Sequence, residues 1–512
     1  MSHDKDTFAE KGNKALFWAC FLSLIATAFG FIIRSMVIGD WQVEFDLTET
    51  QKGEILGVGL WPFALSIVLF SLIIDNIGYG RAMGFAFACH LISAIMTIFA
   101  TGYQMLYWAT FIAALGNGTV EAVINPVVAT MFHRDKTKWL NILHAGWPGG
   151  LVLGGLLTIL LTTVGFDSWQ YKFSLVFIPV IGYGILMLGK KFPVHERVEA
   201  GVSYKSMLQE LGFFGALIIV SLMVYQVGAL PATPPPSYVL WAIILVISIG
   251  FGVYVQSLGR PLFIFLALIM MPLATTELGT DTWISTLMEP EMTKLGLQAG
   301  WVLVYTSFVM MCLRFMAGHV VERISPLGLL ACSATIAILG LTALSKSSGI
   351  GVLLAATLYA FGKTFFWPTM LGVVAERFPK GGALTMNTIA GVGMLSVGIV
   401  GAPFLGFFQD AKTASSLEAY DQANQTALVS TYTVSKNSIF GEYNAVDPVK
   451  IAESTDDAQK ATITELVDTS KKAALQTVAI FPAIMLVCYL ALILYFRSQG
   501  GYKVVHITDA HH

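Results

Sequence analysis

Apolar stretches of about 20 residues, with few charges, recur along most of the 512-residue chain, separated by short polar breaks. A bilayer core of about 30 Å is crossed by a helix of about that length. Hydrophobic residues make up 55% of the chain and charged residues only 12%, which leaves too little polar surface for a soluble domain. The sequence therefore predicts an all-α integral membrane protein and excludes membrane barrels, nucleic-acid binders and soluble enzymes.

Fourteen stretches are long enough to be transmembrane helices, near residues 15–36, 53–74, 82–102, 105–131, 140–165, 171–190, 211–230, 238–258, 262–287, 297–318, 327–345, 350–373, 382–408 and 474–496. The first lacks the cleavage pattern of a signal peptide, so we expect the N-terminus to stay in the cytoplasm. The loops then placed inside hold most Lys and Arg residues, and the short outside loops hold only four lysines. This positive-inside bias predicts a multi-pass plasma membrane protein with both termini cytoplasmic.

Residues 409–473 form a long polar segment between the last two apolar stretches, rich in Ala, Thr, Ser and Asp. The stretch 456–476 has helical periodicity, so we expect an external helical cap. A partly disordered segment is the alternative for such a composition.

The chain contains an internal repeat. Asn141 and Asn387 open equivalent helices, and aligning Pro126 with Pro368 places Glu121 opposite Lys363. Internal repeats are usual in secondary transporters. We expect residues 1–192 to form a six-helix bundle, residues 193–260 to hold a cytoplasmic loop and two inserted helices, and residues 261–512 to form a second six-helix bundle that carries the external segment.

Two motifs resemble those of the major facilitator superfamily. Asp75, Gly78 and Arg81 loosely match its cytoplasmic loop signature, and Gly116-x-Gly118-x-x-Glu121-x-x-x-Asn125-Pro126 resembles the helix that carries an essential Glu in the fucose/proton symporter family. The resemblance implies a major facilitator fold with two pseudo-symmetric six-helix bundles, to which this chain adds two helices. In the fucose symporters an Asp on the first helix also takes part, whereas residues 30–37 here offer Arg34 and no acid.

Glu121 lies in the middle of an apolar helix. A charged side chain at the bilayer centre costs about 2.5–3.5 kcal/mol and usually faces a water-filled cavity. We expect Glu121 to line a transport cavity; a protonated Glu that bridges two helices is the alternative. We expect Lys363 on the facing wall of the cavity. Either Lys363 or Arg34 would form an ion pair with Glu121, and binding of substrate or a proton would break that ion pair. Snorkelling of Lys363 to the interface is the alternative.

Three other charged residues lie within apolar helices. Arg34, near the outer end of the first helix, either binds substrate or snorkels to the interface. Glu277 and Asp281 are one turn apart among hydroxyl side chains, which suits a sugar or Na⁺. The alternative for these two acids is a polar helix end that faces outward.

Further candidates complete the predicted site. His144 could be a proton partner or a packing residue. Trp147, Trp283 and Trp367 could stack on sugar rings or lie at membrane interfaces. The remaining substrate or ion candidates are Asn125, Asn141 and Asn387. We expect a conformational latch formed by Asp75, Gly78, Arg81, Glu322, Arg323 and Arg314. Arg314 is included because of the family resemblance.

The first functional hypothesis is a secondary active transporter that couples H⁺ or Na⁺ to sugar symport, because three acids and three bases within the membrane sum to a neutral cavity. The alternatives are an organic-anion carrier or antiporter, in which Arg34 and Lys363 hold a carboxylate, and an oligopeptide carrier suggested by the inserted helices. A receptor or scaffold would need no buried acid and base at matching repeat positions. Motifs for catalysis, nucleotides or metals are absent from the sequence, so we expect no enzyme, cofactor or metal site. The expected partners are a small-molecule substrate and the bilayer, without nucleic acid, and we expect a functional monomer.

Overall fold

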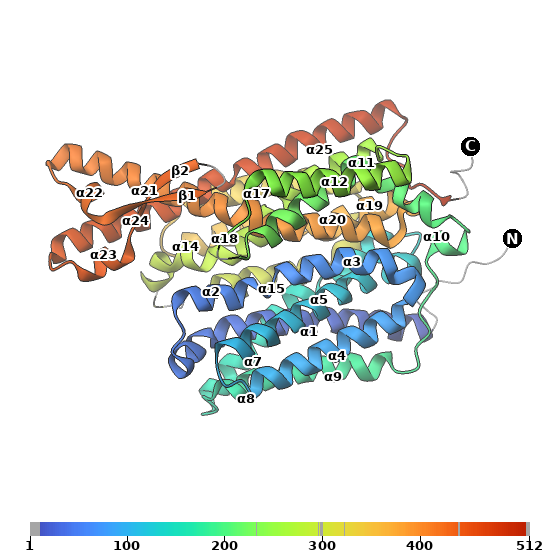
Figure 1. Cartoon of the computed structure of the whole chain (residues 1–512), viewed down its shortest axis with the longest axis horizontal. Coiled ribbons are helices and arrows are strands. Elements are labelled where there is room, and N and C mark those ends of the chain that lie inside the picture. Colours follow the sequence, from blue (N-terminus) through green and yellow to red (C-terminus); the bar gives the residue numbers. More distant parts are fainter. Residues whose placement is uncertain are drawn as a thin grey trace.

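The computed structural model describes residues 11–231, 233–294, 296, 301–321, 323–438 and 441–507. Its long helices run side by side along the long axis of the molecule (Figure 1). Twelve helices of the described residues are long and apolar enough to cross a membrane. The predicted spans 297–318 and 350–373 correspond to the shorter α15 (Trp301–Phe315) and to the pair α18 (Gly351–Lys363) and α19 (Phe366–Arg377). The predicted all-α membrane fold is confirmed, and the count of fourteen spans stays a prediction.

The N-terminal half contains nine helices among the described residues. They are α1 (Lys11–Phe45), α2 (Glu49–Gly57), α3 (Trp61–Ile77), α4 (Tyr79–Ile98), α5 (Tyr103–Met131), α6 (Lys136–Leu143), α7 (Gly146–Thr163), α8 (Trp169–Ser174) and α9 (Phe177–Met187). α5 lies at the centre, and every residue from Gly116 to Ala129 is buried. Gly118 permits this packing, because a Cβ there would lie 2.2 Å from the Phe63 carbonyl oxygen of α3.

The C-terminal half begins with α13 (Pro261–Ala274), a π-helix at Thr275–Gly279 and α14 (Thr280–Lys294). α15 follows, and then α16 (Ala317–Val321), α17 (Pro326–Lys346), α18, α19, a 3₁₀ turn at Pro379–Gly381 and α20 (Gly382–Ser396). A second π-helix at Val397–Gly401 leads into α21 (Ala402–Asn424), and α25 (Ile480–Ser498) is the last helix. Two helices of this half, α13 and α20, thus continue through a π-turn, which shifts the face that the following residues present.

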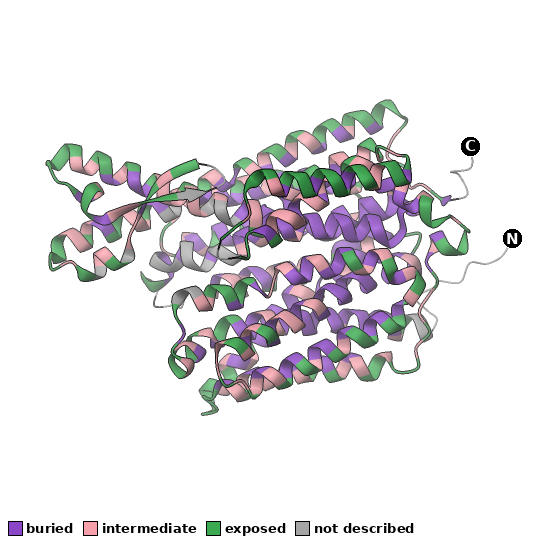
Figure 2. Ribbon diagram, in the orientation of Figure 1, coloured by how far each residue is buried: buried purple, intermediate pink, exposed green. Residues whose placement is uncertain are grey.

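The central segment contributes α10 (Glu196–Glu199), α11 (Tyr204–Gly228) and α12 (Ser237–Val255). α11 packs against α13 and α20, so the inserted pair lies on the outside of the C-terminal half (Figure 1). Most of α12 is exposed (Figure 2), although its sequence is strongly apolar. Its surface therefore suits contact with lipid.

The external segment extends from one end of the bundle as a small folded unit (Figure 1). It comprises the end of α21, α22 (Leu428–Tyr432), strands β1 (Thr433–Ser438) and β2 (Gly441–Val446), α23 (Pro448–Glu453) and α24 (Asp457–Val478). The strands form an antiparallel hairpin, and Leu417, Leu428, Tyr432 and Ile463 form a separate apolar core. The predicted helical cap is thus correct in its helices but missed the hairpin.

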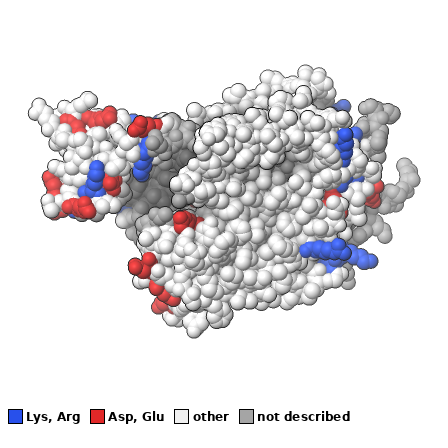
Figure 3. All heavy atoms as spheres, viewed as in Figure 1, with Lys and Arg blue, Asp and Glu red and all other residues white. Residues whose placement is uncertain are grey.

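The two ends of the bundle differ in charge. We call the end where α1 begins and α25 ends the inner end, and the opposite end the outer end, after the orientation that the sequence predicts. On the face shown in Figure 3, the Lys and Arg of the bundle gather at the inner end together with some Asp and Glu, the outer end shows Asp and Glu, and an uncharged band lies between the two ends. This pattern suits a bundle that crosses a bilayer.

Candidate functional site

A cavity with about 800 Å³ of empty space lies between the two halves. The N-terminal half lines it with Phe31, Leu60, Phe63, Glu121, His144, Trp147 and Leu151, and the C-terminal half with Glu277, Leu278, Asp281, Leu303, Arg314, Trp367, Met394 and Val397. The wall is thus mostly apolar, with a few charged groups that converge from both halves. Such a surface is typical of a small-molecule site.

Glu121 is buried in the N-terminal wall and begins a chain of hydrogen bonds. Asn125 Nδ2 donates to Glu121 Oε2 at 2.6 Å, and His144 Nε2 donates to Asn125 Oδ1 at 2.9 Å. Among the described residues, no cation lies within ion-pair distance of Glu121. The structure thus joins three of the candidates named from the sequence, Glu121, Asn125 and His144, by hydrogen bonds.

Asn387 of α20 crosses to the other half beside Glu121. Its Nδ2 donates to the Ala122 carbonyl oxygen at 3.1 Å. That carbonyl is available because Pro126, four residues later, has no N–H to donate to it. A side chain of the C-terminal half therefore contacts the helix that carries Glu121 in the middle of the bundle.

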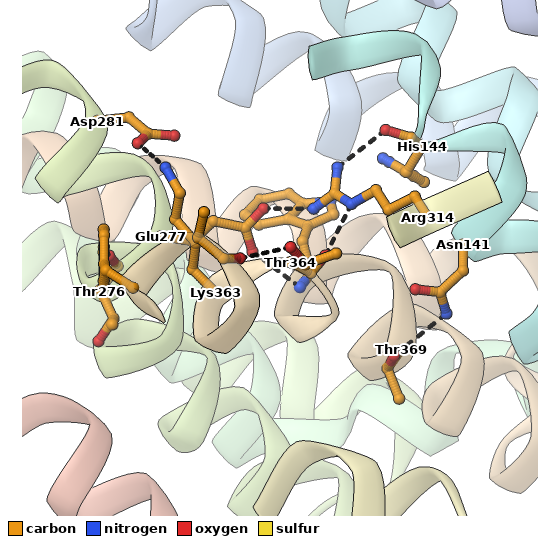
Figure 4. A network of polar contacts seen from close by, with 12 residues as sticks. Asn141, His144, Thr276, Glu277, Asp281, Arg314, Lys363, Thr364 and Thr369 are labelled. Carbon is orange, nitrogen blue, oxygen red and sulfur yellow. Dashed lines mark hydrogen bonds and ion pairs between the residues drawn. The ribbon is translucent and has the colours of Figure 1, made fainter. Parts of the chain in front are cut away.

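Arg314 is the most connected residue of the site (Figure 4). Its guanidinium pairs with Glu277 Oε1 at 2.7 Å, and both side chains are almost completely buried. Nε donates to the Thr364 carbonyl oxygen at 2.7 Å and Nη1 to the His144 carbonyl oxygen at 2.9 Å. Arg314 thus joins the two halves at the cavity, and its predicted place in a cytoplasmic latch is wrong.

The break between α18 and α19 explains how this ion pair is held. Pro368 cannot donate to the Thr364 carbonyl, which is therefore free to accept from Arg314. The Trp367 N–H, in the first turn of α19, donates to Glu277 Oε2 at 3.0 Å. The backbone at the break thus contributes an acceptor to the arginine and a donor to the carboxylate.

Lys363 forms an ion pair with Asp281, a residue of its own half (Figure 4). Its Nζ also lies 5.3 Å from the centre of the Tyr359 ring. The predicted pairing of Lys363 with Glu121 is wrong, because Asp281, just beyond the π-helix, is the nearer carboxylate. Lys363 is completely buried, which also excludes snorkelling.

Arg34 lies inside the N-terminal half and is only 5% exposed. Its Nη1 lies 3.4 Å from the Cβ position of Gly59, and its buried Nε has no hydrogen-bond partner among the described residues. The predicted pairing with Glu121 is absent. Arg34 is one turn beyond Phe31 and close to Leu60, both of which line the cavity.

Contacts between the halves close the inner end of the cavity. Asn141 Nδ2 donates to Thr369 Oγ1 at 3.1 Å, and Thr137 Oγ1 donates to Glu376 Oε1 at 2.5 Å. Lys136 Nζ donates to the Ala375 carbonyl oxygen at 3.3 Å. Sequence reasoning selected Asn141 but missed Thr137, Thr369 and Glu376, since nothing in their sequence separates them from other residues at helix ends.

The latch residues lie at the inner end, in an arrangement that differs from the prediction. Asp75 pairs with Arg197 of α10, a residue that sequence reasoning missed, while Arg81 and Arg323 are exposed. Gly78 has a φ of 83°, the left-handed region that glycine enters without strain. Glu322 lies outside the described residues.

The central loop reaches the inner end through α10. Lys136 Nζ and Glu196 Oε2 are 2.9 Å apart, and His195 Nδ1 accepts from the Arg197 N–H at 3.1 Å. Burial, together with nearby Lys136 and Arg197, lowers the pKa of His195 to about 3. The imidazole of His195 is therefore neutral in the folded protein at neutral pH.

Two of the three predicted tryptophans line the cavity. Trp147 lies on α7 and Trp367 on α19, on opposite walls. A ring centroid distance of 5.7 Å places Trp147 against Phe31. The side chain of Trp283 lies outside the described part of the structure.

Comparisons with known proteins agree with this architecture. The family model described as Major Facilitator Superfamily matches residues 19–403. A curated relative, the protein TsgA homolog of Buchnera aphidicola subsp. Schizaphis graminum, is 23% identical over 219 residues, which are 42% of this chain and 55% of that protein. This chain thus matches about half the length of that relative.

Solved structures share the fold at low sequence identity. The proton:xylose symporter XylE has a TM-score of 0.61 at 11% identity and covers 93% of this chain and 94% of its own. The fucose transporter FucP in its outward conformation gives 0.56 at 14% identity, over 92% and 98% of the two chains. The human organic anion transporter MFSD10 gives 0.57 at 12% identity, over 93% and 99%. Because the family model matches most of this chain, the chain belongs to the Major Facilitator Superfamily and is a membrane transporter, not an enzyme.

Proposed function

We propose that this transporter couples the movement of H⁺ to symport of a neutral sugar by alternating access. The observation that carries the proposal is the state of the three acids in the cavity wall. Glu277 is paired with Arg314 and Asp281 with Lys363, whereas the Glu121 carboxylate hydrogen-bonds only with the neutral Asn125 among the described residues. A carboxyl group without a cationic partner can bind and release a proton without breaking an ion pair.

The two ion pairs support a neutral substrate. Each neutralises a carboxylate within the C-terminal half, so the wall offers polar groups with little net charge. Trp147 and Trp367 line opposite sides of the cavity, and aromatic rings of this kind can stack on a sugar ring. Glu277 and Asp281, the candidate Na⁺ ligands, are both in ion pairs, which favours H⁺ over Na⁺ as the coupling ion. XylE and FucP, which share the fold, are sugar:proton symporters.

Coupling would pass through the hydrogen bonds that join the halves. Glu121 is connected through Asn125 to His144, whose carbonyl accepts from Arg314. Protonation of Glu121 alters the acceptor of the hydrogen bond from Asn125. It thereby alters the series of hydrogen bonds that ends at Arg314. In our proposal this favours the alternate state, in which the contacts of Asn141 and Thr137 across the inner end separate.

A second candidate, transport of an organic anion such as a sugar acid, is favoured by Arg34. This buried cation has no ion-pair partner among the described residues and lies beside the outer part of the cavity wall. A substrate carboxylate would supply the missing charge. MFSD10, an organic anion transporter, shares the fold to a similar degree.

We also propose that the inner end faces the cytoplasm in the plasma membrane and that the monomer is the working unit. The basic inner end supports this orientation (Figure 3). The cavity is formed by the two halves of one chain, so a second copy is not required to complete it.

A thermal-shift panel on the purified protein separates the two candidates. Neutral hexoses and deoxyhexoses are compared with their uronic and aldonic acids, because a ligand of the folded state stabilises by RT ln(1 + [L]/Kd). Stabilisation by neutral sugars alone supports the symporter. Stabilisation by the acids alone, lost in Arg34→Gln, replaces it with the anion carrier.

A further inference from the structure

A second hollow of the molecule lies on its outer surface, away from the transport cavity. It lies between α4 and α9 near the inner end, and its volume of about 1000 Å³ includes the open space in front of it. Residues along its length include Gly80, Gly84 and Phe87 of α4 and Ile181, Gly184 and Ile185 of α9. We call it the α4–α9 groove.

Small residues keep this groove open. A Cβ added at Gly84 would meet no heavy atom within 4 Å, so the space beside α4 is empty there. At Gly184, by contrast, a Cβ would lie 2.5 Å from the Phe87 ring, which therefore forms one wall. The groove is thus open beside Gly84 and has a largely apolar lining.

The surroundings place this channel in contact with lipid. Ile178, Ile181 and Ile185 of α9 are between 48% and 63% exposed. Since α9 belongs to a candidate membrane span, these side chains face acyl chains of the bilayer. The groove therefore opens sideways into the membrane and not into the transport cavity.

The inner mouth of the groove is basic. Lys190 lines it beside Gly80, and Lys191 and Arg81 are the next residues along the chain, both exposed. None of these three cations has an ion-pair partner among the described residues, and no Asp or Glu lines the groove. In Figure 3 a cluster of Lys and Arg lies at this end of the N-terminal half. Gly78, the residue that caps α4, has no side chain to accept from its first N–H groups.

We propose that the α4–α9 groove binds an anionic phospholipid of the bilayer. One acyl chain lies along the groove beside Gly84, and the phosphate lies between Lys190, Lys191 and Arg81. An apolar channel that ends at unpaired cations at the level of the head groups matches the two parts of such a lipid. Basic residues near the membrane surface bind anionic head groups, with an effect of roughly five-fold per residue.

Native mass spectrometry of the full-length protein in detergent tests the proposal. Phosphatidylglycerol and phosphatidylcholine with identical acyl chains are added at equal concentration, and the lipid retained by the protein is counted. The wild type should retain phosphatidylglycerol at least roughly five-fold better. Lys190→Gln with Lys191→Gln should remove most of this preference. Gly84→Leu, whose Cβ would meet no heavy atom within 4 Å, should fill part of the groove and lower retention of both lipids.

Arg497→Gln is the matched control, because Arg497 is an exposed cation at the inner end of α25, far from the groove (Figure 1). It should leave the preference unchanged. Equal retention of the two lipids by the wild type, or an equal loss in Arg497→Gln and in the double variant, would overturn the site. Unchanged retention in Gly84→Leu would overturn the placement of the acyl chain, provided that the variant remains monodisperse on gel filtration.

Discussion

The two repeat-related helices α5 and α18–α19 each carry a proline late in the span, and they use it differently. In both, the proline leaves a carbonyl four residues earlier without its helical donor. In α5 this carbonyl belongs to Ala122 and accepts from Asn387 of the other half. In α18–α19 it belongs to Thr364 and accepts from Arg314 of the same half. The free carbonyl in α5 thus accepts from a neutral amide, and the free carbonyl in α18–α19 accepts from a charged guanidinium.

The neighbouring acids follow the same division. Near Pro126, Glu121 has the neutral partner Asn125, while near Pro368 Glu277 has the cation Arg314. A buried ion pair is costly to break, because each charge would be left alone in a low dielectric. This difference supports the proposal that the C-terminal half holds a fixed neutral wall while the N-terminal half exchanges a proton.

The largest effect is expected from removing the charge that holds the C-terminal wall. Arg314→Met leaves Glu277 buried without its cation, which typically costs about 3–5 kcal/mol. Adding Glu277→Met should restore most of the stability, because both charges are then absent. Thermal unfolding in detergent measures both variants, and a double variant no more stable than the single one would contradict the paired wall.

The second ion pair should respond in the same way with a smaller loss. Lys363→Met leaves Asp281 unpaired, and because the Asp281 side chain is 13% exposed we expect a cost at the lower end, about 3 kcal/mol. Substrate affinity should also fall, since Asp281 lines the cavity. Adding Asp281→Asn to Lys363→Met should recover stability. Unchanged affinity in Lys363→Met would remove this pair from the substrate site.

The proline comparison can be tested by restoring the missing donor. Asn387→Ala leaves the Ala122 carbonyl unsatisfied, at a cost of about 2 kcal/mol. Pro126→Ala supplies the missing N–H, so the cost of Asn387→Ala should largely disappear in that background. Pro368→Ala is the matched control and should give no such rescue. A double-mutant cycle from unfolding temperatures measures the coupling, and additive effects would refute it.

The smallest effect concerns acid sensitivity at the inner end, where α10 contacts the N-terminal half. The folded-state pKa of His195, about 3, lies below its unfolded value of about 6.5. The unfolded chain therefore binds the proton first, and stability is full above pH 6.5 and falls as the pH decreases toward 3. Between pH 7 and pH 5 this amounts to about 1–2 kcal/mol.

His195→Asn keeps a side-chain acceptor for the Arg197 N–H and should flatten this part of the pH dependence. Unfolding temperatures at pH 7 and pH 5 provide the measurement. If the two proteins lose the same stability on acidification, another group is responsible.

The sequence predicted the fold and much of the cavity wall, but not the pairing of its charges. Apolar stretches and the repeat placed Glu121, Glu277 and Asp281 on helices that face a common space, because these features depend on helical period alone. Which base each acid meets depends on the π-helix at Thr275–Gly279 and on the break after Lys363, which no periodicity indicates. The predicted pairing of Glu121 with Lys363 was wrong for this reason.

Contacts between segments far apart in the chain were also beyond sequence reasoning. Arg197 and Glu376 lie in or beside loops, where their charges are indistinguishable from ordinary solvated ones. Only the folded chain brings them to Asp75 and Thr137. The strands of the external segment were missed because its helical periodicity, which is real in α24, dominated the pattern.

The central claim is that Glu121 binds the coupled proton, and proteoliposomes that contain the Glu121→Gln variant test it most directly. Two quantities are measured with the sugar identified by thermal shift: proton entry driven by a sugar gradient, and sugar counterflow without any gradient of protons. The account predicts that Glu121→Gln abolishes proton entry and gradient-driven accumulation while counterflow continues. Sugar-driven proton entry that survives in the variant would contradict the account.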